Sequence, residues 1–246
     1  MSRDFPSHAM LLAAGLGTRM RPLTNTTPKP LIPVAGRTLL DRVLDWMQKA
    51  GVQHVVVNTH YLADQLEAHV KSRAAPRIAI SPEHDLLLET GGGINKALPL
   101  LGSAPFFSAN SDTLCIDGEK PALQRLAAAW DDARMDALLL LHPVQQSVGY
   151  EGKGDFFLNP DGTLRRREKD GTAPYVFTGV QLLHPRLFAA APQGAFSMNV
   201  LYDRDRSSDG TLPRVCGLVH DGSWLHVGDP EGLRQAEAWL AAHGKI

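Results

Sequence analysis

The chain of 246 residues is 43% hydrophobic, which fits a single large α/β domain with a substantial core better than two small domains. Its 25 lysines and arginines nearly balance 26 aspartates and glutamates, so the net charge of −1 creates no field that attracts nucleic acid or an anionic membrane surface. The two cysteines, Cys115 and Cys216, lack disulfide or zinc-site spacing, so we expect a cytoplasmic protein. No stretch approaches the roughly 18 apolar residues of a membrane span, and with the balanced charge we expect neither membrane nor nucleic-acid partners.

Apolar runs alternate with segments of helical period through residues 1–143, and this pattern predicts βαβ units with a largely parallel sheet. The expected strands are Ala9–Ala13, His54–Asn58, Arg77–Ser81, Phe106–Ala109 and Ala137–His142. The expected helices are Leu39–Ala50, Leu62–Ser72, Ile94–Leu101 and Pro121–Ala133. Ligands of open α/β sheets bind beyond the carboxyl ends of the strands, so we expect the loops after these strands to form the functional site.

Beyond Pro143 the pattern changes to shorter strands separated by glycine, proline and aspartate. These strands are expected at Asp155–Leu158, Thr163–Arg167, Tyr175–Leu183, Arg214–Val219 and Trp224–Val227. Asn159-Pro160-Asp161-Gly162 predicts a hairpin turn between the first two, and Pro230–His243 predicts a closing helix with proline in its first turn. With no linker or internal repeat, residues 1–246 are expected to form one domain.

The first expected strand runs into the most informative motif of the chain, Ala13-Ala14-Gly15-Leu16-Gly17-Thr18-Arg19. Glycines at a sharp turn let the backbone touch a ligand, and successive N–H groups in such a turn form a concavity that binds anions. Arg19 and Lys29 add two cations at a spacing that lets both close over one polyphosphate. The motif predicts a polyphosphate site; the alternative is an ordinary strand-to-helix turn with surface cations.

Two other glycine-rich phosphate motifs are excluded by residue identity. A dinucleotide-binding G-x-G-x-x-G would need glycine where Met20 stands, and the P-loop pattern G-x-x-x-x-G-K-[ST] occurs nowhere in the chain. The site is therefore neither a dinucleotide fingerprint nor a P-loop.

The string L-A-A-G-x-G-T-R-M-x-P-L-T, followed by Pro28-Lys29-Pro30-Leu31, resembles the signature of the sugar-1-phosphate nucleotidyltransferases, also called nucleotide-sugar pyrophosphorylases. Within that family, Leu88-Glu89-Thr90-Gly91-Gly92-Gly93-Ile94 resembles the corresponding segment of the N-acetylmuramate-1-phosphate uridylyltransferases. The resemblance runs from Met10 to about Leu240, and it is strong at the N-terminus and weaker after Pro143.

The resemblance implies a three-layer, Rossmann-like (GT-A-like) α/β fold with a mixed, mostly parallel central sheet. Residues 1–143 would form the nucleotide-binding half and residues 144–246 the sugar-phosphate-binding half. It also implies that the enzyme joins UTP to a sugar 1-phosphate, N-acetylmuramate 1-phosphate first, giving a UDP-sugar and pyrophosphate in cell-wall sugar recycling. Another sugar phosphate or phosphocholine as acceptor, or a non-catalytic nucleotide-sugar-binding homologue, remain as alternatives; the oligomeric state is unspecified.

The catalytic residues implied by the resemblance are Arg19 on the pyrophosphate side, Lys29 at the α-phosphate and Asp112 as metal ligand. The same resemblance assigns the nucleotide to the first loop and to the Leu88–Ile94 segment. Its nucleotide contacts would be Leu12, Ala13, Ala14, Gly15, Gly17, Thr18, Glu89 and Gly92. Three consecutive glycines before a helix can present backbone groups to a flat base edge, although a flexible linker is the alternative.

Metal binding is expected at Asp112, because it follows an apolar strand and magnesium is usually held by one or two carboxylates with substrate phosphates. The alternative is that Asp112 caps the next turn. The family's second carboxylate is replaced by His226, and imidazole suits manganese or zinc better than magnesium. Three outcomes stay open: His226 ligates a softer metal, His226 contacts phosphate, or Asp221 or Asp229 supplies the carboxylate.

The resemblance also implies five residues that contact the sugar phosphate. They are Asn110, Gly154, Glu168, Lys169 and Thr178. Glu168-Lys169 precedes Thr178-Gly179 much as a Glu-Lys pair precedes a Thr-Gly pair in related pyrophosphorylases. The run Arg165–Asp170 is equally typical of a solvated strand edge, so both interpretations stand.

Overall fold

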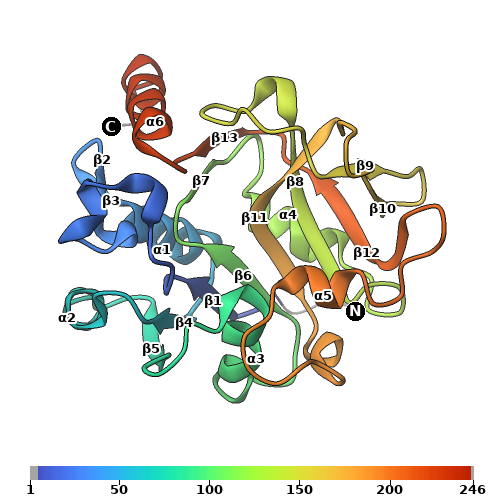
Figure 1. The fold of residues 1–246 in the computed structure, drawn as a ribbon, viewed down its shortest axis with the longest axis horizontal. Helices are drawn as coiled ribbons and strands as arrows, with labels where there is room; N and C mark the ends of the chain where they lie inside the picture. Colours follow the sequence, from blue (N-terminus) through green and yellow to red (C-terminus); the bar gives the residue numbers. More distant parts are fainter. Residues whose placement is uncertain (1–4, 245–246) are drawn as a thin grey trace.

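A nine-stranded mixed sheet crosses the centre of the protein in the order β5-β4-β1-β6-β11-β8-β12-β10-β9 (Figure 1). The computed structural model describes residues 5–244. Its strands in this sheet are β1 His8–Leu12, β4 His54–Thr59, β5 Arg77–Pro82, β6 Phe106–Asn110, β8 Ala137–Pro143, β9 Phe156–Leu158, β10 Thr163–Arg166, β11 Tyr175–Leu183 and β12 Thr211–Val219. Only β10 and β11 run against the other strands of this sheet, so the expected mixed, mostly parallel sheet is confirmed.

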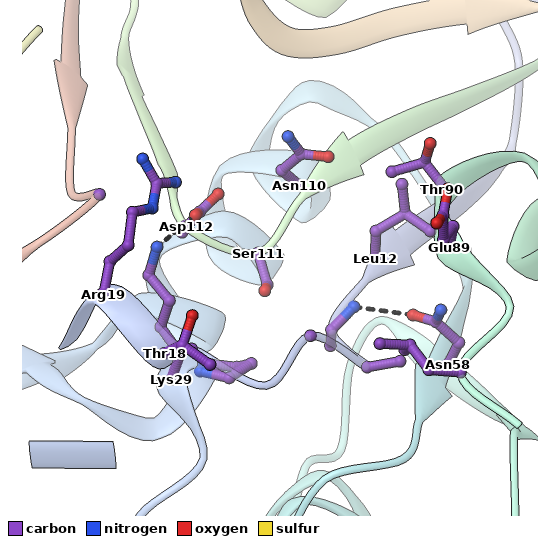
Figure 2. Close-up of a pocket in the computed structure, with 17 residues that line it drawn as sticks. Leu12, Thr18, Arg19, Lys29, Asn58, Glu89, Thr90, Asn110, Ser111 and Asp112 are labelled. Carbon is purple, nitrogen blue, oxygen red and sulfur yellow. Dashed lines mark hydrogen bonds and ion pairs between the residues drawn. The ribbon is translucent and has the colours of Figure 1, made fainter. Parts of the chain in front are cut away.

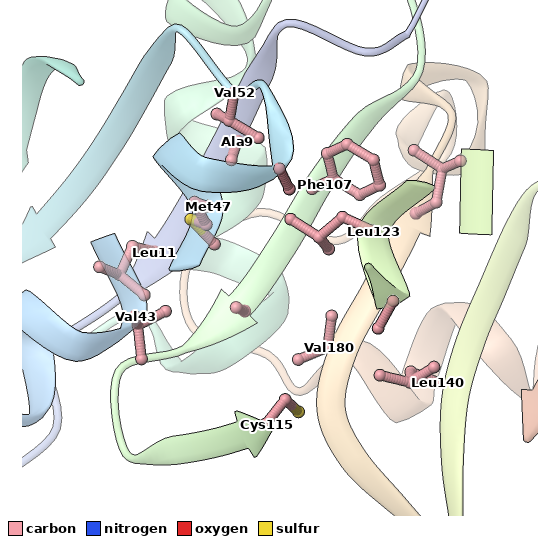
Figure 3. Packing of buried hydrophobic residues seen from close by; sticks show 14 of the residues in the cluster. Ala9, Leu11, Val43, Met47, Val52, Phe107, Cys115, Leu123, Leu140 and Val180 are labelled. Carbon is pink, nitrogen blue, oxygen red and sulfur yellow. The ribbon is translucent and has the colours of Figure 1, made fainter. Parts of the chain in front are cut away.

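Helices cover both faces of this sheet and make three layers (Figure 1). On one face lie α1 Leu39–Ala50, α2 Ala63–Lys71 and α4 Ala122–Ala129, and on the other α3 Glu89–Leu101 and α5 Met198–Tyr202. Successive side chains of a strand point to opposite faces, and β1 follows this rule: Leu11 packs with α1, whereas Met10 packs with α3. Figure 3 shows the first of these two cores around Leu11, Val43 and Phe107.

Local sequence explains where the best-predicted helix begins and ends. The Thr38 side chain accepts a hydrogen bond from the backbone N–H of Asp41, as an N-cap should, and Gly51 adopts a left-handed conformation with φ 114° at the other end. Between them, Leu40, Val43, Leu44 and Met47 are buried on one face. The expected helix Leu39–Ala50 is confirmed at both ends.

A second, smaller assembly joins the two halves of the chain. Strand β7, Thr113–Ile116, pairs antiparallel with β13, Ser223–His226, and α6, Pro230–Ala242, packs beside them. Asp229 caps α6 by accepting a hydrogen bond from the Gly232 N–H. Strand β7 was not expected from the sequence, and it places the C-terminal segment next to Asp112.

Helix α3 begins at Glu89, five residues before the expected start at Ile94. The expectation that the three glycines 91–93 precede the helix is therefore wrong, because they form its first turns. Helix α5 and the short hairpin of β2 Pro33–Val34 and β3 Arg37–Thr38 were also not expected. The expected hairpin between β9 and β10 is confirmed. Among the helices of residues 5–244, none has both the length and the apolar character to cross a membrane.

Candidate active site

A cleft of about 350 Å³ opens at the carboxyl ends of β1, β4 and β6 (Figure 2). Eleven residues predicted from the sequence line it: Leu12, Ala13, Ala14, Gly15, Gly17, Thr18, Arg19, Lys29, Glu89, Asn110 and Asp112. The remaining lining residues are Pro30, Asn58, Leu87, Thr90, Ser111 and Gly228. The cleft is thus built from the loop after β1, the end of β6, the start of α3 and the segment after β13.

The loop after β1 is held by three short 3₁₀ turns, Thr18–Met20, Leu23–Asn25 and Lys29–Leu31. Gly17 has φ 62°, and a Cβ there would lie 2.9 Å from Thr24 Cγ2 and 3.0 Å from Lys29 Cβ. The buried Thr24 hydroxyl donates a 2.8 Å hydrogen bond to the Gly17 carbonyl. Both the backbone angle and the close approach require glycine, and the packing brings Lys29 next to the loop that carries Arg19.

Lys29 and Asp112 meet across the cleft wall, with Lys29 Nζ 2.5 Å from Asp112 Oδ2. The two side chains are 11% and 24% exposed, so the pair is shielded on most sides but open to the cleft. Asp112 lies between the end of β6 and the start of β7, as expected for a carboxylate at a strand end. Charged groups in such a partly dry position interact more strongly than exposed pairs do.

Arg19 has no hydrogen-bonded or ion-paired partner within residues 5–244, although its side chain lies on the same side of the cleft as Lys29 and Asp112 (Figure 2). A guanidinium without a protein partner is available to a planar or tetrahedral anion. Leu12, Asn58, Glu89 and Thr90 lie on the opposite side. The cleft therefore has one cationic end and one end of apolar, amide and hydroxyl groups with the carboxylate of Glu89.

Asn110 is fixed by the neighbouring strand. It ends β6, which pairs antiparallel with β11. A Cβ at Gly179 would lie 2.7 Å from Asn110 Nδ2, and Gly179 has φ 84°. Glycine at this point of β11 lets the Asn110 amide occupy the cleft wall, directly beside the loop that carries Asp112.

His226 lies behind the cleft rather than in its lining. It pairs with Thr113 across β7 and β13, and its ring contacts Trp224 and Tyr150 at centroid distances of 5.4 and 5.9 Å. A Cβ on the lining residue Gly228 would lie 2.4 Å from His226 Nε2. Burial lowers the pKa of His226, with Lys29 and Arg19 adding to the effect against the opposing Asp112 carboxylate, so the imidazole is neutral near pH 7.

The two carboxylates considered as substitutes for His226 are committed elsewhere. Asp221 Oδ1 lies 2.8 Å from Arg125 Nη1, and Asp229 Oδ1 accepts the capping hydrogen bond of α6. Residues 5–244 contain no group of three or more histidine, cysteine or acidic side chains arranged to hold a metal. Asp112 is the cleft-lining carboxylate beside Lys29 and is paired with its ammonium. One carboxylate matches the usual way in which proteins hold magnesium, whose other ligands are phosphate oxygens and water.

Besides His226, five predicted residues are not brought into the cleft. Gly92 lies inside α3, and its N–H donates to the Phe196 carbonyl, so it cannot present that group to a base. Thr178 is buried, with its hydroxyl donating to the Leu140 carbonyl.

Gly154 has φ 72° and accepts from Arg167 Nε through its carbonyl. Glu168 and Lys169 line a different cavity beside residues 206–210. The Gly154 carbonyl is thus occupied by Arg167, and the Glu168 and Lys169 carbonyls also accept from Arg167 Nη1.

The chain is similar to known proteins along most of its length. A family model described as "MobA-like NTP transferase domain" matches residues 9–203. The chain is 48% identical to an N-acetylmuramate alpha-1-phosphate uridylyltransferase of Caulobacter vibrioides, over 96% of this chain and 98% of that protein. It is 37% identical to the protein of the same description from Neisseria meningitidis serogroup B, over 95% and 98%.

Solved structures share the fold. HddC from Yersinia pseudotuberculosis, complexed with GMP-PN, superposes with a TM-score of 0.75 at 21% identity, over 95% of this chain and 99% of that chain. A UDP-glucose pyrophosphorylase complexed with UDP-glucose gives 0.72 at 18% identity, over 98% and 99%. At these identities the likeness shows the architecture alone.

Proposed function

This chain belongs to the family of the MobA-like NTP transferase domain, and from that premise we propose that it joins UTP to N-acetylmuramate 1-phosphate, giving a UDP-sugar and pyrophosphate. The observation that carries the proposal is 48% identity along nearly the whole of this chain and of a uridylyltransferase with that acceptor in its name. The cleft supports it, since it offers two cations and the Asp112 carboxylate at one end, and apolar, amide and hydroxyl groups with the Glu89 carboxylate at the other.

In this reaction an oxygen of the sugar phosphate attacks the α-phosphorus of UTP in line. The bond to the bridging oxygen between the α- and β-phosphates breaks, and pyrophosphate leaves with that electron pair. No protein nucleophile is needed, so catalysis consists of positioning two anions and neutralising the charge that grows on the leaving group. We assign Arg19 to the pyrophosphate and Lys29 to the α-phosphate.

Binding of a divalent ion is proposed at Asp112, with the neutral imidazole of His226 as a neighbour. When bound, the ion would supply positive charge to the phosphate oxygens and thereby lower their mutual repulsion. Magnesium suits the carboxylate, whereas an imidazole close by favours manganese. The shift of Lys29 from Asp112 to phosphate would accompany this binding, because both cations compete for one carboxylate.

The base and ribose are proposed to occupy the side of Leu12, Ala13, Glu89 and Thr90, with the phosphates toward Arg19 and Lys29. The sugar phosphate is proposed to enter beside Asn110, where β11 and residues 144–244 adjoin the cleft. Residues 1–143 would accordingly serve the nucleotide and the remainder the acceptor. A cytoplasmic location is proposed because both cysteines are buried free thiols, which fits a reducing compartment.

A matrix of nucleoside triphosphates against sugar 1-phosphates, read out by pyrophosphate release, tests the function. We expect UTP with N-acetylmuramate 1-phosphate to turn over fastest. Equal rates with N-acetylglucosamine 1-phosphate would contradict the acceptor, and a faster rate with another triphosphate would contradict the base. Nucleotide-sugar binding without pyrophosphate release from any combination would show a non-catalytic homologue instead.

A further inference from the structure

Glu83, directly after β5, is a carboxylate buried to 1% exposure with no cationic partner within residues 5–244. Glu83 Oε1 accepts a 2.7 Å hydrogen bond from Asn58 Nδ2, and Oε2 accepts a 2.8 Å bond from the backbone N–H of Leu88. Asn58 Oδ1 in turn accepts a 2.7 Å bond from the Ala13 N–H. A continuous chain of hydrogen bonds therefore links the loop after β1 to the residue that precedes α3.

Both ends of this series of hydrogen bonds lie in the cleft wall. Ala13 lines the cleft directly, and Leu88 is flanked by the lining residues Leu87 and Glu89. Glu89 has φ 59°, a conformation that costs a residue with a side chain about 1 kcal/mol or more, so the turn into α3 needs external support. The bond from Leu88 to Glu83 supplies that support one residue earlier. Figure 2 shows Asn58 beside Leu12, Glu89 and Thr90 with its bond to the first loop.

The third glycine of α3 makes room for the same network. A Cβ at Gly93 would lie 2.8 Å from Glu83 Oε1 and 2.9 Å from Asn58 Nδ2, closer than real Cβ contacts allow. The helix can therefore lie against the Asn58 and Glu83 side chains only where it carries glycine. The Gly-Gly-Gly run thus serves packing at this position, and the packed group is a pair of polar side chains rather than a ligand.

The hydrogen-bond donors around positions 58 and 83 match an amide at position 58 and a carboxylate at position 83. Two N–H donors, from Asn58 and Leu88, converge on the two oxygens of Glu83, and a carboxylate alone offers two acceptors there. A glutamine at position 83 would turn its amide NH₂ toward one of these donors. An aspartate at position 58 would face the Glu83 carboxylate with a second negative charge. Either change leaves a buried group unpaired or repelled, which is costly.

We propose that Asn58 and Glu83 are positioning residues that hold the Ala13 amide and the turn into α3 at the separation the nucleotide base requires. The inference rests on the proposed function for the identity of the ligand. Neither side chain takes part in the chemical step; both act through the backbone they hold. Their loss should weaken the triphosphate much more than the sugar phosphate, whose proposed place is beside Asn110, outside this chain of hydrogen bonds.

An exchange of the two functional groups tests this. In the double variant N58D/E83Q, the amide introduced at position 83 donates to the carboxylate introduced at position 58, and its carbonyl accepts from the Leu88 N–H. The new carboxylate still accepts from Ala13, so every bond and the net charge are restored. We expect N58D and E83Q alone to raise KM for UTP about tenfold, with kcat and KM for the sugar phosphate nearly unchanged. The double variant should recover most of that loss, as coupled pairs do.

The matched control is Asp136→Asn, which damages a buried carboxylate far from the cleft. Asp136 accepts from Arg186 Nε at 2.5 Å and from Arg214 Nε at 2.7 Å, so its loss should lower Tm without moving KM for UTP. The proposal is overturned if the single variants lower Tm with KM for UTP unchanged, if both substrates weaken equally, or if the double variant behaves as the sum of its parts.

Failure of the proposed function leaves this test intact. If the protein turns over another triphosphate, or none, the same four proteins are compared by calorimetric titration of the triphosphate that the wild type binds. Weakened binding in each single variant and recovery in the double variant would support the positioning role with any base. Equal affinities across the set would refute it independently of the activity screen.

Discussion

Lys29 Nζ lies 2.5 Å from Asp112 Oδ2, although 83 residues separate them in the chain. The contact joins the loop after β1 to the junction of β6 and β7, so the cation assigned to phosphate and the carboxylate assigned to metal neutralise each other. Each group is thus held in place by the other at the edge of the cleft. Binding of a triphosphate with its divalent ion would replace the Lys29–Asp112 ion pair by two others, Lys29 with phosphate and Asp112 with the divalent ion.

Lysine 29 and arginine 19 provide the first prediction. Lys29→Ala and Arg19→Ala should each lower kcat for UDP-sugar formation by at least about tenfold, because each removes charge that stabilises the transition state. Steady-state kinetics and a thermal melt measure the two effects separately. Tm should change little for Arg19→Ala, because Arg19 makes no ion pair within residues 5–244. Lys29→Ala should lower Tm, because it leaves the partly buried Asp112 carboxylate without its partner, so kcat is compared at a temperature where both variants are folded.

The matched control is Lys71→Ala, which removes a 69% exposed lysine on α2 whose ion pair with Glu67 is solvent-screened. Its kcat should equal that of the wild type. Wild-type turnover in either Arg19→Ala or Lys29→Ala would remove that residue from the catalytic machinery.

Histidine 226 provides the second prediction. With a neutral imidazole near Asp112, the wild type should favour manganese over magnesium, and His226→Asp should shift the preference toward magnesium because a hard cation prefers oxygen. Initial rates with each metal, and manganese binding followed by electron paramagnetic resonance, measure the shift. Asp221→Asn is the control, because Asp221 is paired with Arg125. Identical metal profiles in wild type and His226→Asp would exclude His226 from the metal site.

The first loop and the parallel strands were predictable because their signals are local. An apolar run followed by Ala13-Ala14-Gly15 predicts both the strand and the turn after it. Arg19 and Lys29 lie within the same short motif. Asp112 was predictable for the same reason, since it lies two residues beyond the end of the apolar run that became β6. These motifs, together with the family resemblance that they carry, named eleven of the residues that line the cleft.

The rest depends on contacts between distant segments. β7 has only four residues, and its partner β13 begins at Ser223, more than a hundred residues later. Three consecutive glycines argue against a helix by propensity. The atoms that leave no room for a side chain at Gly91 and Gly92, from Phe196 and Gly194, come from a loop about a hundred residues later. Asn58 and Glu83 are polar residues near the ends of β4 and β5, and no motif in the sequence singles them out. Their joint role arises because parallel strands bring those ends together.

The histidines behind β7 provide the third prediction, a loss of stability at mildly acidic pH. His220 Nε2 donates to the Ile116 carbonyl, and His142 lies between Ser147 and Gly222. Burial lowers the pKa of both below the usual 6.5, and for His220 the neighbouring His142 adds to this against opposing Asp221 and Asp117. Both rings are therefore neutral in the fold, while the unfolded chain takes up protons near pH 6.5.

The sign follows directly: the unfolded state binds more protons, so the free energy of unfolding should fall as pH drops below 6.5 toward the lowered pKa values. The slope is about 1.4 kcal/mol per pH unit for each such histidine. Urea unfolding between about pH 5 and pH 7 measures it, in a range where aspartates of low pKa stay ionised in both states. His220→Gln keeps an N–H donor but cannot titrate, so its slope should be smaller, whereas exposed His243→Gln should match the wild type. Parallel slopes in all three proteins would contradict the assignment.

Glycine 91 provides the last prediction, which opposes helix propensity to packing. Alanine is the better helix former by about 1 kcal/mol, so Gly91→Ala would stabilise a free helix. In α3, however, a Cβ at this position would lie 2.4 Å from Phe196 Cε2 and 2.8 Å from the Phe196 carbonyl oxygen, which also accepts the Gly91 N–H. Relief of that overlap must move backbone, and overpacking of this kind typically costs about 1–3 kcal/mol.

We therefore expect Gly91→Ala to lower Tm by several degrees, at about 2–4 °C for each kcal/mol in a domain of this size. Gly171→Ala is the control, because the nearest atoms to a Cβ there, all from Glu168, lie 3.6–3.9 Å away in ordinary contact. Its Tm should stay equal or rise slightly through the less flexible unfolded chain. A higher Tm for Gly91→Ala than for the wild type would mean that Phe196 does not pack against α3 as described, and that propensity decides at this position.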